Sequence, residues 1–251
     1  RVYWKKAYEI PPASRQARGK AIVNLLSFGS GENIASVLQV KEFDEKKFLL
    51  MVTKKGQVKK TRLSAYSHPR QAGINAITLK SGDALIGCQI TTGANEVFLA
   101  TAQGKAIRFS EKDAREMGRM ASGVRGIRLA KNDEVIAVET MGKGDATLLS
   151  VTSKGFGKKT AFSAYRKQSR GGKGIINIKC TPKNSKVVNV LSVAEDDEVL
   201  VVTAGGMGVR SPANQIRTSG RNAQGVRLIR LRDRDEVASI TRVVAKNGED
   251  E

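Results

Sequence analysis

Short runs of alternating apolar and polar residues, separated by glycines, recur along the whole sequence. Their clearest form is an apolar run, then the pattern T-x-x-G, then a basic run. Alternation with a period of two is typical of β-strands, and a T-x-x-G link between two such runs is typical of a hairpin. We therefore predict hairpins over residues 49–61, 97–109, 148–160 and 200–211. Residues 1–11 (RVYWKKAYEIP) look like the second strand of a fifth hairpin whose first strand is missing.

A second pattern alternates with the hairpins: a glycine, an aliphatic residue four positions later, and another aliphatic residue two positions after that. It begins at Gly19, Gly73, Gly123, Gly172 and Gly225, at intervals of 54, 50, 49 and 53 residues. Three copies carry an aspartate ten residues after the glycine, namely Asp83, Asp133 and Asp235. The only stretch with a weak helical pattern is 111–117 (EKDAREM). The chain is therefore built from repeats of about 50 residues.

Repeats of this length, with about four short strands each, match the blades of a β-propeller. We predict an all-β, propeller-like fold of about five four-stranded blades that forms a single domain over residues 1–251. Two packed β-sandwiches are the alternative architecture. The even spacing favours the propeller, because no linker interrupts the series. We interpret residues 246–251 as the start of an acidic tail.

The charge balance points to a polyanionic partner. The 251 residues include 44 Lys and Arg against 24 Asp and Glu, which gives a net charge of +20. Nucleic acid is the commonest partner of so basic a protein, and an anionic membrane is the next. The sequence lacks an apolar run long enough to span a membrane, which favours nucleic acid. Two cysteines far apart, and the absence of a signal peptide, predict a cytoplasmic protein without disulfides.

The cations repeat at equivalent positions of the units, so we expect them to form a ring on the outer rim. In or near the turn that carries the repeat glycine they are Arg15, Arg18, Lys20, Arg70, Arg119, Arg170, Lys173 and Arg221. In the hairpins they are Lys59, Lys60, Arg108, Lys158, Lys159 and Arg210. Between the paired aliphatic residues they are Arg128 and Arg230. Such a ring predicts binding of a curved duplex through its phosphates, with little dependence on base sequence. Solvated charge without a ligand is the alternative.

The stretch QSRGGKG (168–174) is the strongest local candidate for a phosphate contact. It is not a Walker loop, because Gly174 stands where Ser or Thr would bind magnesium. It is not a dinucleotide fingerprint either, because a strand pattern follows instead of a helix. Glycines in a turn expose backbone N–H groups, so we predict a contact with a nucleic-acid phosphate. The residues concerned are Gln168, Arg170, Gly171, Gly172, Lys173 and Gly174. A flexible turn between blades is the alternative.

The sequence lacks a recognisable catalytic or metal-binding constellation. A single histidine, His68, excludes histidine-based triads and most zinc sites. Aromatic residues make up only 5% of the chain, which argues against stacking platforms for single strands. We therefore expect no catalytic residues, no metal and no cofactor. A propeller that docks other proteins is the alternative function, and it requires an exposed apolar patch.

The stretch QSRGGKG resembles the Q-R-R-G-G-K-G box of the C-terminal domain of the bacterial DNA gyrase A protein, with Ser169 in place of an arginine. The segments 15–26, 123–129 and 222–231 are also similar to that family. The resemblance implies a six-bladed β-pinwheel, a propeller whose blades exchange strands, with the first blade missing from this chain. The related domain of topoisomerase IV is the close alternative.

The same resemblance implies a role for the domain. The family wraps double-stranded DNA around its outer edge and so supports ATP-driven negative supercoiling by DNA gyrase, a type II topoisomerase. The implied partners are DNA, the breakage-reunion domain of the same gyrase A protein and the gyrase B protein, with the isolated domain a monomer. ATP and magnesium are used elsewhere in the intact enzyme.

Overall fold

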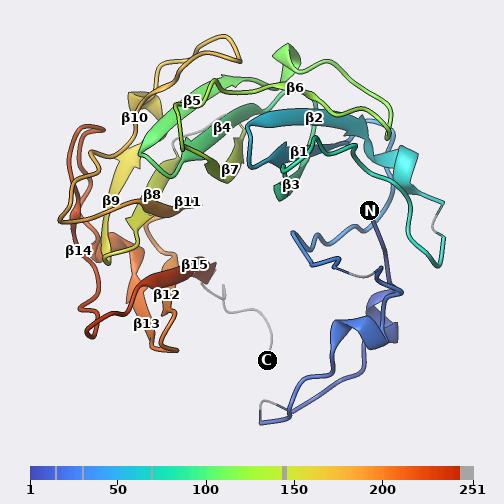
Figure 1. Cartoon of the computed structure of the whole chain (residues 1–251), viewed down its shortest axis with the longest axis horizontal. Coiled ribbons are helices and arrows are strands. Elements are labelled where there is room, and N and C mark those ends of the chain that lie inside the picture. The colour runs from blue at the N-terminus through green and yellow to red at the C-terminus, as the bar shows by residue number, and fades with distance from the viewer. Residues whose placement is uncertain (15, 30, 69, 143–145, 244–251) are drawn as a thin grey trace.

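The computed structural model describes residues 1–14, 16–29, 31–68, 70–142 and 146–243. In these residues four antiparallel β-sheets follow one another along an arc (Figure 1). Between the strands lie short 3-10 helices, and the described residues contain no α-helix. No helix among them is long and apolar enough to cross a membrane. The prediction of an all-β fold is confirmed.

Three of the sheets have four strands. The first sheet contains β1 (Phe48–Thr53), β2 (Gln57–Arg62), β3 (Leu85–Thr91) and β6 (Val124–Arg125). The second sheet contains β4 (Glu96–Thr101), β5 (Lys105–Ser110), β7 (Val135–Met141) and β10 (Ile175–Ile176). The third sheet contains β8 (Thr147–Thr152), β9 (Phe156–Ala161), β11 (Val187–Val193) and β14 (Val226–Arg227). Within the described residues the last sheet has three strands, β12 (Glu198–Thr203), β13 (Gly208–Pro212) and β15 (Val237–Val243).

Six 3-10 helices connect these strands or lie in the N-terminal repeat. They are η1 (Ala7–Glu9), η2 (Ile22–Asn24), η3 (Leu63–Tyr66), η4 (Glu111–Asp113), η5 (Phe162–Ala164) and η6 (Ala213–Gln215). The weak helical pattern over 111–117 therefore corresponds only to the single turn η4. Each of the helices η3 to η6 directly follows a hairpin and leads into the segment that pairs with the preceding repeat.

Neighbouring sheets exchange their outermost strands. The strand order is β3-β1-β2-β6 in the first sheet, and in each four-stranded sheet the hairpin is in the middle. The short outer strand β6 follows the hairpin of the second sheet in the chain, yet it pairs with β2 of the first sheet. Strands β10 and β14 do the same for β5 and β9. The strands β3, β7, β11 and β15 lie on the inner side of the arc, and β6, β10 and β14 lie on its outer side (Figure 1).

The core lies between the sheets. Each central strand buries both of its faces, because side chains alternate between the two neighbouring sheets. Leu50 and Val52 of the first sheet pack with Val97 and Leu99 of the second. Leu49 and Met51, which point the other way, pack with Tyr66 and Ile74. This explains why the central strands read as nearly continuous apolar runs.

The repeated aspartates fasten three of the four hairpins to the segment before the inner strand. The carboxylate of Asp83 accepts the N–H of Lys55, at 2.9 Å, in the first hairpin turn. Asp133 accepts the N–H of Gln103 and Asp235 that of Gly205 in the same way. The third sheet differs, because Asn184 stands at this position and bonds locally to Thr181. A carboxylate that joins two distant segments explains the spacing seen in the sequence.

The fourth copy of the glycine pattern begins at Gly174 and not at Gly172. Ile175, directly after Gly174, pairs with Ala106, just as Val124 after Gly123 pairs with Val58. A β-carbon on Gly174 would lie 2.5 Å from the carbonyl oxygen of Ala106, and its φ of +69° favours glycine. The glycine therefore permits the close approach of the exchanged strand.

The prediction of about five four-stranded blades compares with four sheets in the described residues, three with four strands and the last with three. The first repeat, up to residue 47, forms no sheet in the described residues; it makes only the bridge between Val2 and Ile74. This bridge is equivalent to the pairing of Val58 with Val124, so residues 1–6 correspond to β2. Among its described residues the repeat has no counterpart of the central strand β1, which in the first sheet pairs with both β2 and β3. The acidic tail predicted at 246–251 lies outside the described residues.

Candidate nucleic-acid interface

The turns that lead into the outer strands carry an arginine at the same place in three repeats. Arg119, Arg170 and Arg221 each lie four residues before the glycine that opens the outer strand. The chain enters these turns beside the second strand of a hairpin, through the parallel bridges Lys60–Glu116, Arg108–Lys167 and Lys159–Thr218. Because this pairing repeats, the three arginines lie at equivalent positions on the outer side of the arc.

Two of these arginines also bind backbone. The guanidinium of Arg170 donates to the carbonyl of Arg125 at 2.9 Å, and that of Arg221 donates to the equivalent carbonyl of Ile176 at 3.0 Å. Each arginine therefore ties its own turn to the outer strand of the preceding sheet. Both are half-buried, whereas Arg119 is exposed.

In QSRGGKG the glycines serve mainly to bring the sheets together. The N–H of Gly171 donates to the carbonyl of Gly126 at 2.6 Å, and the carbonyl of Gly172 accepts the N–H of Arg128. The expectation that this turn exposes its amides is therefore wrong for Gly171. Lys173 is exposed, and the side-chain nitrogen of Gln168 is buried without a hydrogen-bond partner among the described residues.

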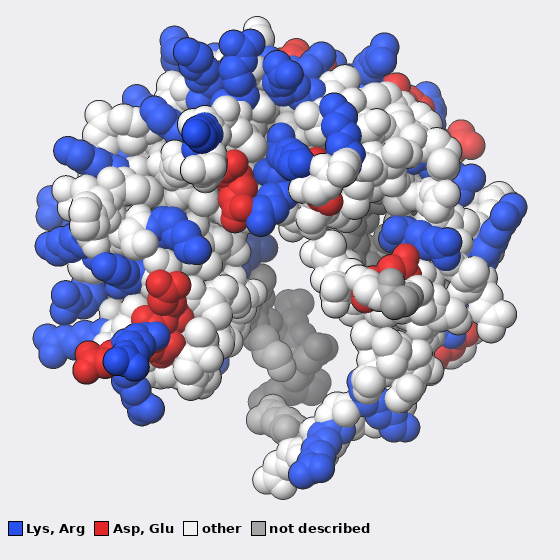
Figure 2. All heavy atoms as spheres, viewed as in Figure 1, with Lys and Arg blue, Asp and Glu red and all other residues white. Residues whose placement is uncertain are grey.

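Most of the other predicted cations are exposed. They are Arg18, Lys20, Arg70, Arg119, Arg128, Lys173, Arg210 and Arg230. Figure 2 shows Lys and Arg side chains gathered along the outer edge of the arc, with fewer Asp and Glu. Arg15 lies outside the described residues. The structure therefore brings a band of positive charge together along one edge.

Four hairpin lysines do not belong to this band. Lys59, Lys60, Lys158 and Lys159 are all buried, so the prediction that they lie exposed on the rim is wrong. The ammonium of Lys60 lies 5.1 Å from the centre of the Phe48 ring. The ammonium of Lys159 pairs with Glu195 at 2.8 Å. The cause is that both faces of a hairpin are covered by neighbouring sheets or turns, so neither set of alternating residues reaches solvent.

Arg108 is a further correction, because its contacts are internal. Its guanidinium pairs with Glu96 at 2.5 Å and donates to the carbonyls of Phe162 and Tyr165. It also lies 4.1 Å from the centre of the Phe162 ring. Arg108 thus connects β5 to the segment that enters the next turn.

Several exposed arginines that also repeat were not predicted from the sequence. Arg115, Arg166 and Arg217 each lie eight residues before an outer-strand glycine. Arg125 and Arg227 occupy the outer strands β6 and β14 themselves. In two repeats these arginines are visible in the sequence as the last residue of G-V-R, at 123–125 and 225–227. The remaining arginines did not align as a repeat, because the fourth copy was counted from Gly172 and not from Gly174. These residues extend the band of positive charge.

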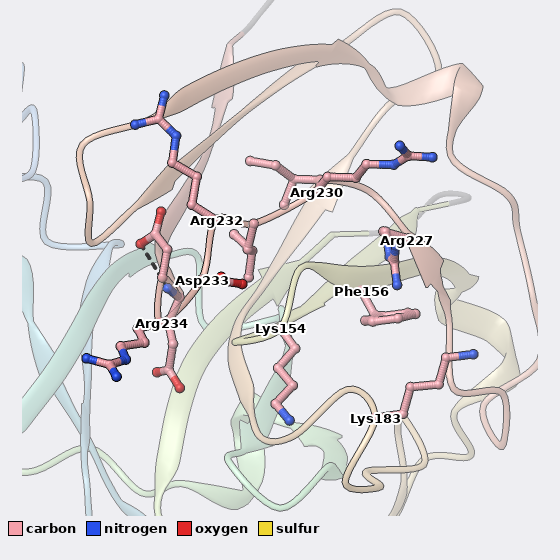
Figure 3. Close-up of a pocket in the computed structure, with 12 residues that line it drawn as sticks. Lys154, Phe156, Lys183, Arg227, Arg230, Arg232, Asp233 and Arg234 are labelled. Carbon is pink, nitrogen blue, oxygen red and sulfur yellow. Dashed lines mark hydrogen bonds between the residues drawn. The ribbon is translucent and has the colours of Figure 1, made fainter.

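An open cleft of about 560 Å³ lies beside the third hairpin and the start of the last inner strand. Arg227 and Lys183 both lie 5.5 Å from the centre of the Phe156 ring. Figure 3 shows that Arg230, Arg232 and Arg234 point in different directions, and Asp233 lies among them. The cations do not converge on one point, as a small anionic ligand would require. The cleft is better described as part of the basic surface.

Other chemistry has little support in the described residues. They contain no group of three or more His, Cys, Asp or Glu side chains placed to hold a metal ion. Burial raises the pKa of the Cys88 thiol to about 11, which makes it a poor nucleophile at neutral pH. Burial likewise raises the pKa values of Tyr66 and Tyr165 to about 12.

The chain matches a known protein family along most of its length. The chain matches the family described as DNA gyrase C-terminal domain, beta-propeller, over residues 1–41, 47–92, 95–140, 146–194 and 197–243. It is 44% identical to the DNA gyrase A protein of Salmonella typhimurium over 243 residues, which cover 97% of this chain and 28% of the relative. It is 40% identical to the gyrase A protein of Haemophilus influenzae in a match that covers all of this chain and 32% of that relative. The chain thus spans about a third or less of these curated relatives.

Two solved structures have the same fold. The C-terminal domain of DNA topoisomerase IV matches with a TM-score of 0.86 and 25% identity, over 94% of this chain and 74% of that one. A DNA gyrase A C-terminal domain matches with a TM-score of 0.82 and 26% identity, over 91% and 76%. Since the family match covers all five repeats and the sequence identity to gyrase A proteins reaches 44%, the chain belongs to the DNA gyrase A C-terminal domain family of β-propellers.

Proposed function

We propose that this domain binds double-stranded DNA along its outer edge, bends it and so supports negative supercoiling by DNA gyrase in the cytoplasm. It acts as one unit without a cofactor or metal of its own, and ATP and magnesium serve other domains. Its partners are DNA, the breakage-reunion domain of the gyrase A protein, and the gyrase B protein. The names of the relatives support membership in gyrase, and the wrapping itself is our inference.

The observation that carries the proposal is the repetition of cations at equivalent turns. Arg119 and Arg221 lie in the turns before the outer strands β6 and β14 of two different sheets, and Arg128 and Arg230 repeat in the segments that follow. Phosphates follow one another along a duplex, so a series of equivalent cations on a curved edge can contact them in succession. Contacts with phosphates carry no base information, so the binding is independent of sequence.

The charge is sufficient to bend the duplex. Bending about 110 Å of DNA smoothly through a half-turn costs about 13 kcal/mol for a persistence length of about 500 Å. Each phosphate contact releases counterions worth about 1.2 kcal/mol at 0.1 M salt. About a dozen contacts therefore offset the bend, and a net charge of +20 can supply them. The affinity must then fall steeply as the salt concentration rises.

The decisive experiment measures plasmid topology. Relaxed plasmid is incubated with the protein and a type I topoisomerase, and the linking number is read after the protein is removed. Wrapping shifts the linking number, and the direction of the shift gives the sense of the wrap. An unchanged linking number at saturating protein contradicts the proposal. Binding of a partner protein that survives high salt would instead support the protein-docking alternative.

A matched pair of variants locates the interface. Arg221 lies in the turn before the outer strand β14, whereas Arg242 lies on the inner strand β15. We expect Arg221→Ala to lower duplex affinity by about eightfold at 0.1 M salt and the salt slope by about 0.9, as for one lost phosphate contact. Arg242→Ala should change neither by a comparable amount. Equal losses in the two variants would mean that net charge, and not the outer edge, determines binding.

A further inference from the structure

The turn of residues 219–222 in the last repeat has an unusual arrangement of its peptide groups. The carbonyl of Ser219 accepts the hydroxyl of Thr160 at 2.9 Å. The next two carbonyls, of Gly220 and Arg221, accept the buried ammonium of Lys158 at 2.7 and 3.1 Å. Three successive carbonyls therefore point inward, toward the third sheet.

The amide groups of this turn consequently point outward. In a trans peptide the N–H and the C=O point in opposite directions, and the described residues include no cis peptide. The N–H groups opposite these carbonyls belong to Gly220, Arg221 and Asn222, and within the described residues they have no hydrogen-bond partner. Gly220 and Asn222 are exposed. Successive outward N–H groups form a concave site that suits an anion.

Lys158 is the unusual member of this arrangement. It is fully buried, and its third contact is the Thr160 hydroxyl at 3.0 Å, so no carboxylate among the described residues neutralises it. The charged group that faces it from the turn is Arg221, and Tyr165 from the segment after η5 is uncharged because burial raises its pKa to about 12. Burial, with a smaller contribution from Arg221, lowers the pKa of Lys158 to about 8.

The equivalent positions in other sheets show that the sheet itself does not need a lysine. Lys158 pairs with Ser150 across the hairpin, and the same place is occupied by Ile107 in the second sheet and Val209 in the last. Lys59 is buried at this place in the first sheet, but its ammonium donates to Ala76 and Thr61 instead of to a turn. Lys59 also lies near Arg119 of the equivalent turn, and burial likewise lowers its pKa to about 8. Within the described residues, a buried ammonium that donates to the carbonyls of the turn before an outer strand is therefore seen only in the third sheet.

We propose that the N–H groups of Gly220, Arg221 and Asn222 bind a backbone phosphate of DNA, and that Lys158 is the positioning residue that holds this turn open. The proposal rests on the proposed function, DNA binding at the outer edge. A phosphate above the turn favours the protonated form of Lys158, so binding takes up a proton at mildly alkaline pH. The QSRGGKG turn lacks both features, because Gly171 has its amide occupied and Ile107 lies where Lys158 would be.

The test compares duplex affinity at pH 7 and pH 9 at constant salt, by fluorescence anisotropy with a short labelled duplex. If the phosphate raises the pKa of Lys158 from about 8 to about 9, the loss of its proton weakens binding about fivefold between these pH values. In Lys158→Met this part of the pH dependence disappears, and affinity at pH 7 falls by a similar factor. Lys186→Met, which removes an exposed lysine of the same repeat, should keep the ratio of affinities at pH 7 and pH 9 that the unmodified protein has.

A second measurement needs no variant. In amide NMR spectra of the unmodified protein, titration with the duplex should shift the N–H signals of Gly220, Arg221 and Asn222 more than those of Ser169 and Arg170. Equal shifts in the two turns, or a Lys158→Met ratio equal to that of the unmodified protein, would overturn the proposal. Absence of duplex binding at both pH values would instead overturn the proposed function.

Discussion

The second sheet and the last sheet contain the same ion pair in different surroundings. Arg108 pairs with Glu96 in the second, and Arg210 pairs with Glu198 in the last. The Arg108 side chain is 19% exposed and the Arg210 side chain 60%. Strand β10 and the segment before it cover the second sheet, whereas the described residues place no strand beside the outer edge of β13. The exchanged strand thus converts a surface arginine into an internal one.

Substitution of the hairpin glycines should give the largest difference in unfolding free energy between the two sheets. Gly104 and Gly206 both have positive φ, +79° and +81°. A β-carbon on Gly104 would collide with the carbonyl oxygen of Ile178, whereas one on Gly206 would meet nothing within 4 Å. We expect Gly104→Ala to lower the free energy of unfolding by about 3–5 kcal/mol, through backbone strain and steric overlap. Gly206→Ala, which has only the strain, should lose about 1–2 kcal/mol.

Urea denaturation of both variants measures these losses. Because the turns have the same backbone conformation, each variant is the control for the other. Similar losses would show that the exchanged segment relaxes away from Gly104 at little cost, and that strand exchange contributes less to stability than its geometry indicates.

The two arginines give the next largest difference. Arg108→Met leaves Glu96 half-buried without its main partner and removes a donor to two carbonyls, so we expect a loss of about 2–4 kcal/mol in unfolding free energy. Arg210→Met breaks an exposed pair and should lose less than about 1 kcal/mol. Thermal or urea unfolding at neutral pH distinguishes these values.

Duplex binding should show the opposite order for the same variants. Arg210 is exposed and can contact a phosphate, so Arg210→Met should weaken binding about eightfold at 0.1 M salt, the value for one contact. Arg108→Met should bind normally under conditions in which it remains folded. A larger binding defect in Arg108→Met than in Arg210→Met would contradict the assignment of Arg108 to an internal role.

The sequence predicts the repeats well, but it does not predict which residues of a hairpin are exposed. Period and turn chemistry place the hairpin 49–61 almost where β1 and β2 lie. The exposure of a side chain is harder to predict, because neighbouring sheets or turns cover both faces of each hairpin. Alternation therefore cannot separate a buried Lys158 from a surface lysine. Strands of two residues, such as β6 and β10, are too short to show any periodicity.

The candidate site was predicted only in part, for a related reason. Arginines such as Arg119 and Arg221 are visible as repeated charges in the sequence. Backbone amides have no sequence signature of their own, so the turn at 219–222 is visible only once Lys158 is seen beneath it. The glycines and cations of QSRGGKG pointed to that turn instead, where the structure uses the glycines for close packing of strands.

The smallest expected difference concerns the aspartates that fasten the hairpins. Asp133 accepts the amides of Gln103 and Glu134, and Asp235 accepts those of Gly205 and Glu236, all at 2.8–2.9 Å. Since these contacts are the same with and without an exchanged strand, Asp133→Ala and Asp235→Ala should lower the free energy of unfolding by small and similar amounts. Urea midpoints of the two variants at neutral pH check this expectation.

The pH dependence of stability tests the role of Asp235 separately. A hydrogen bond from Thr203, followed by that from the Gly205 amide, lowers the pKa of Asp235. Its stabilising contribution is therefore complete above its ordinary pKa of about 3.8 and is lost as the pH falls through the lower value of the folded state. Urea midpoints at pH 5 and pH 3 should show a smaller acid-dependent loss in Asp235→Ala than in Asp233→Ala, which removes an exposed neighbour. If the two variants lose equally, the carboxylate does not hold the hairpin, and the fastening must then come from the backbone bonds of β12 with β15, such as Val201 with Ile240.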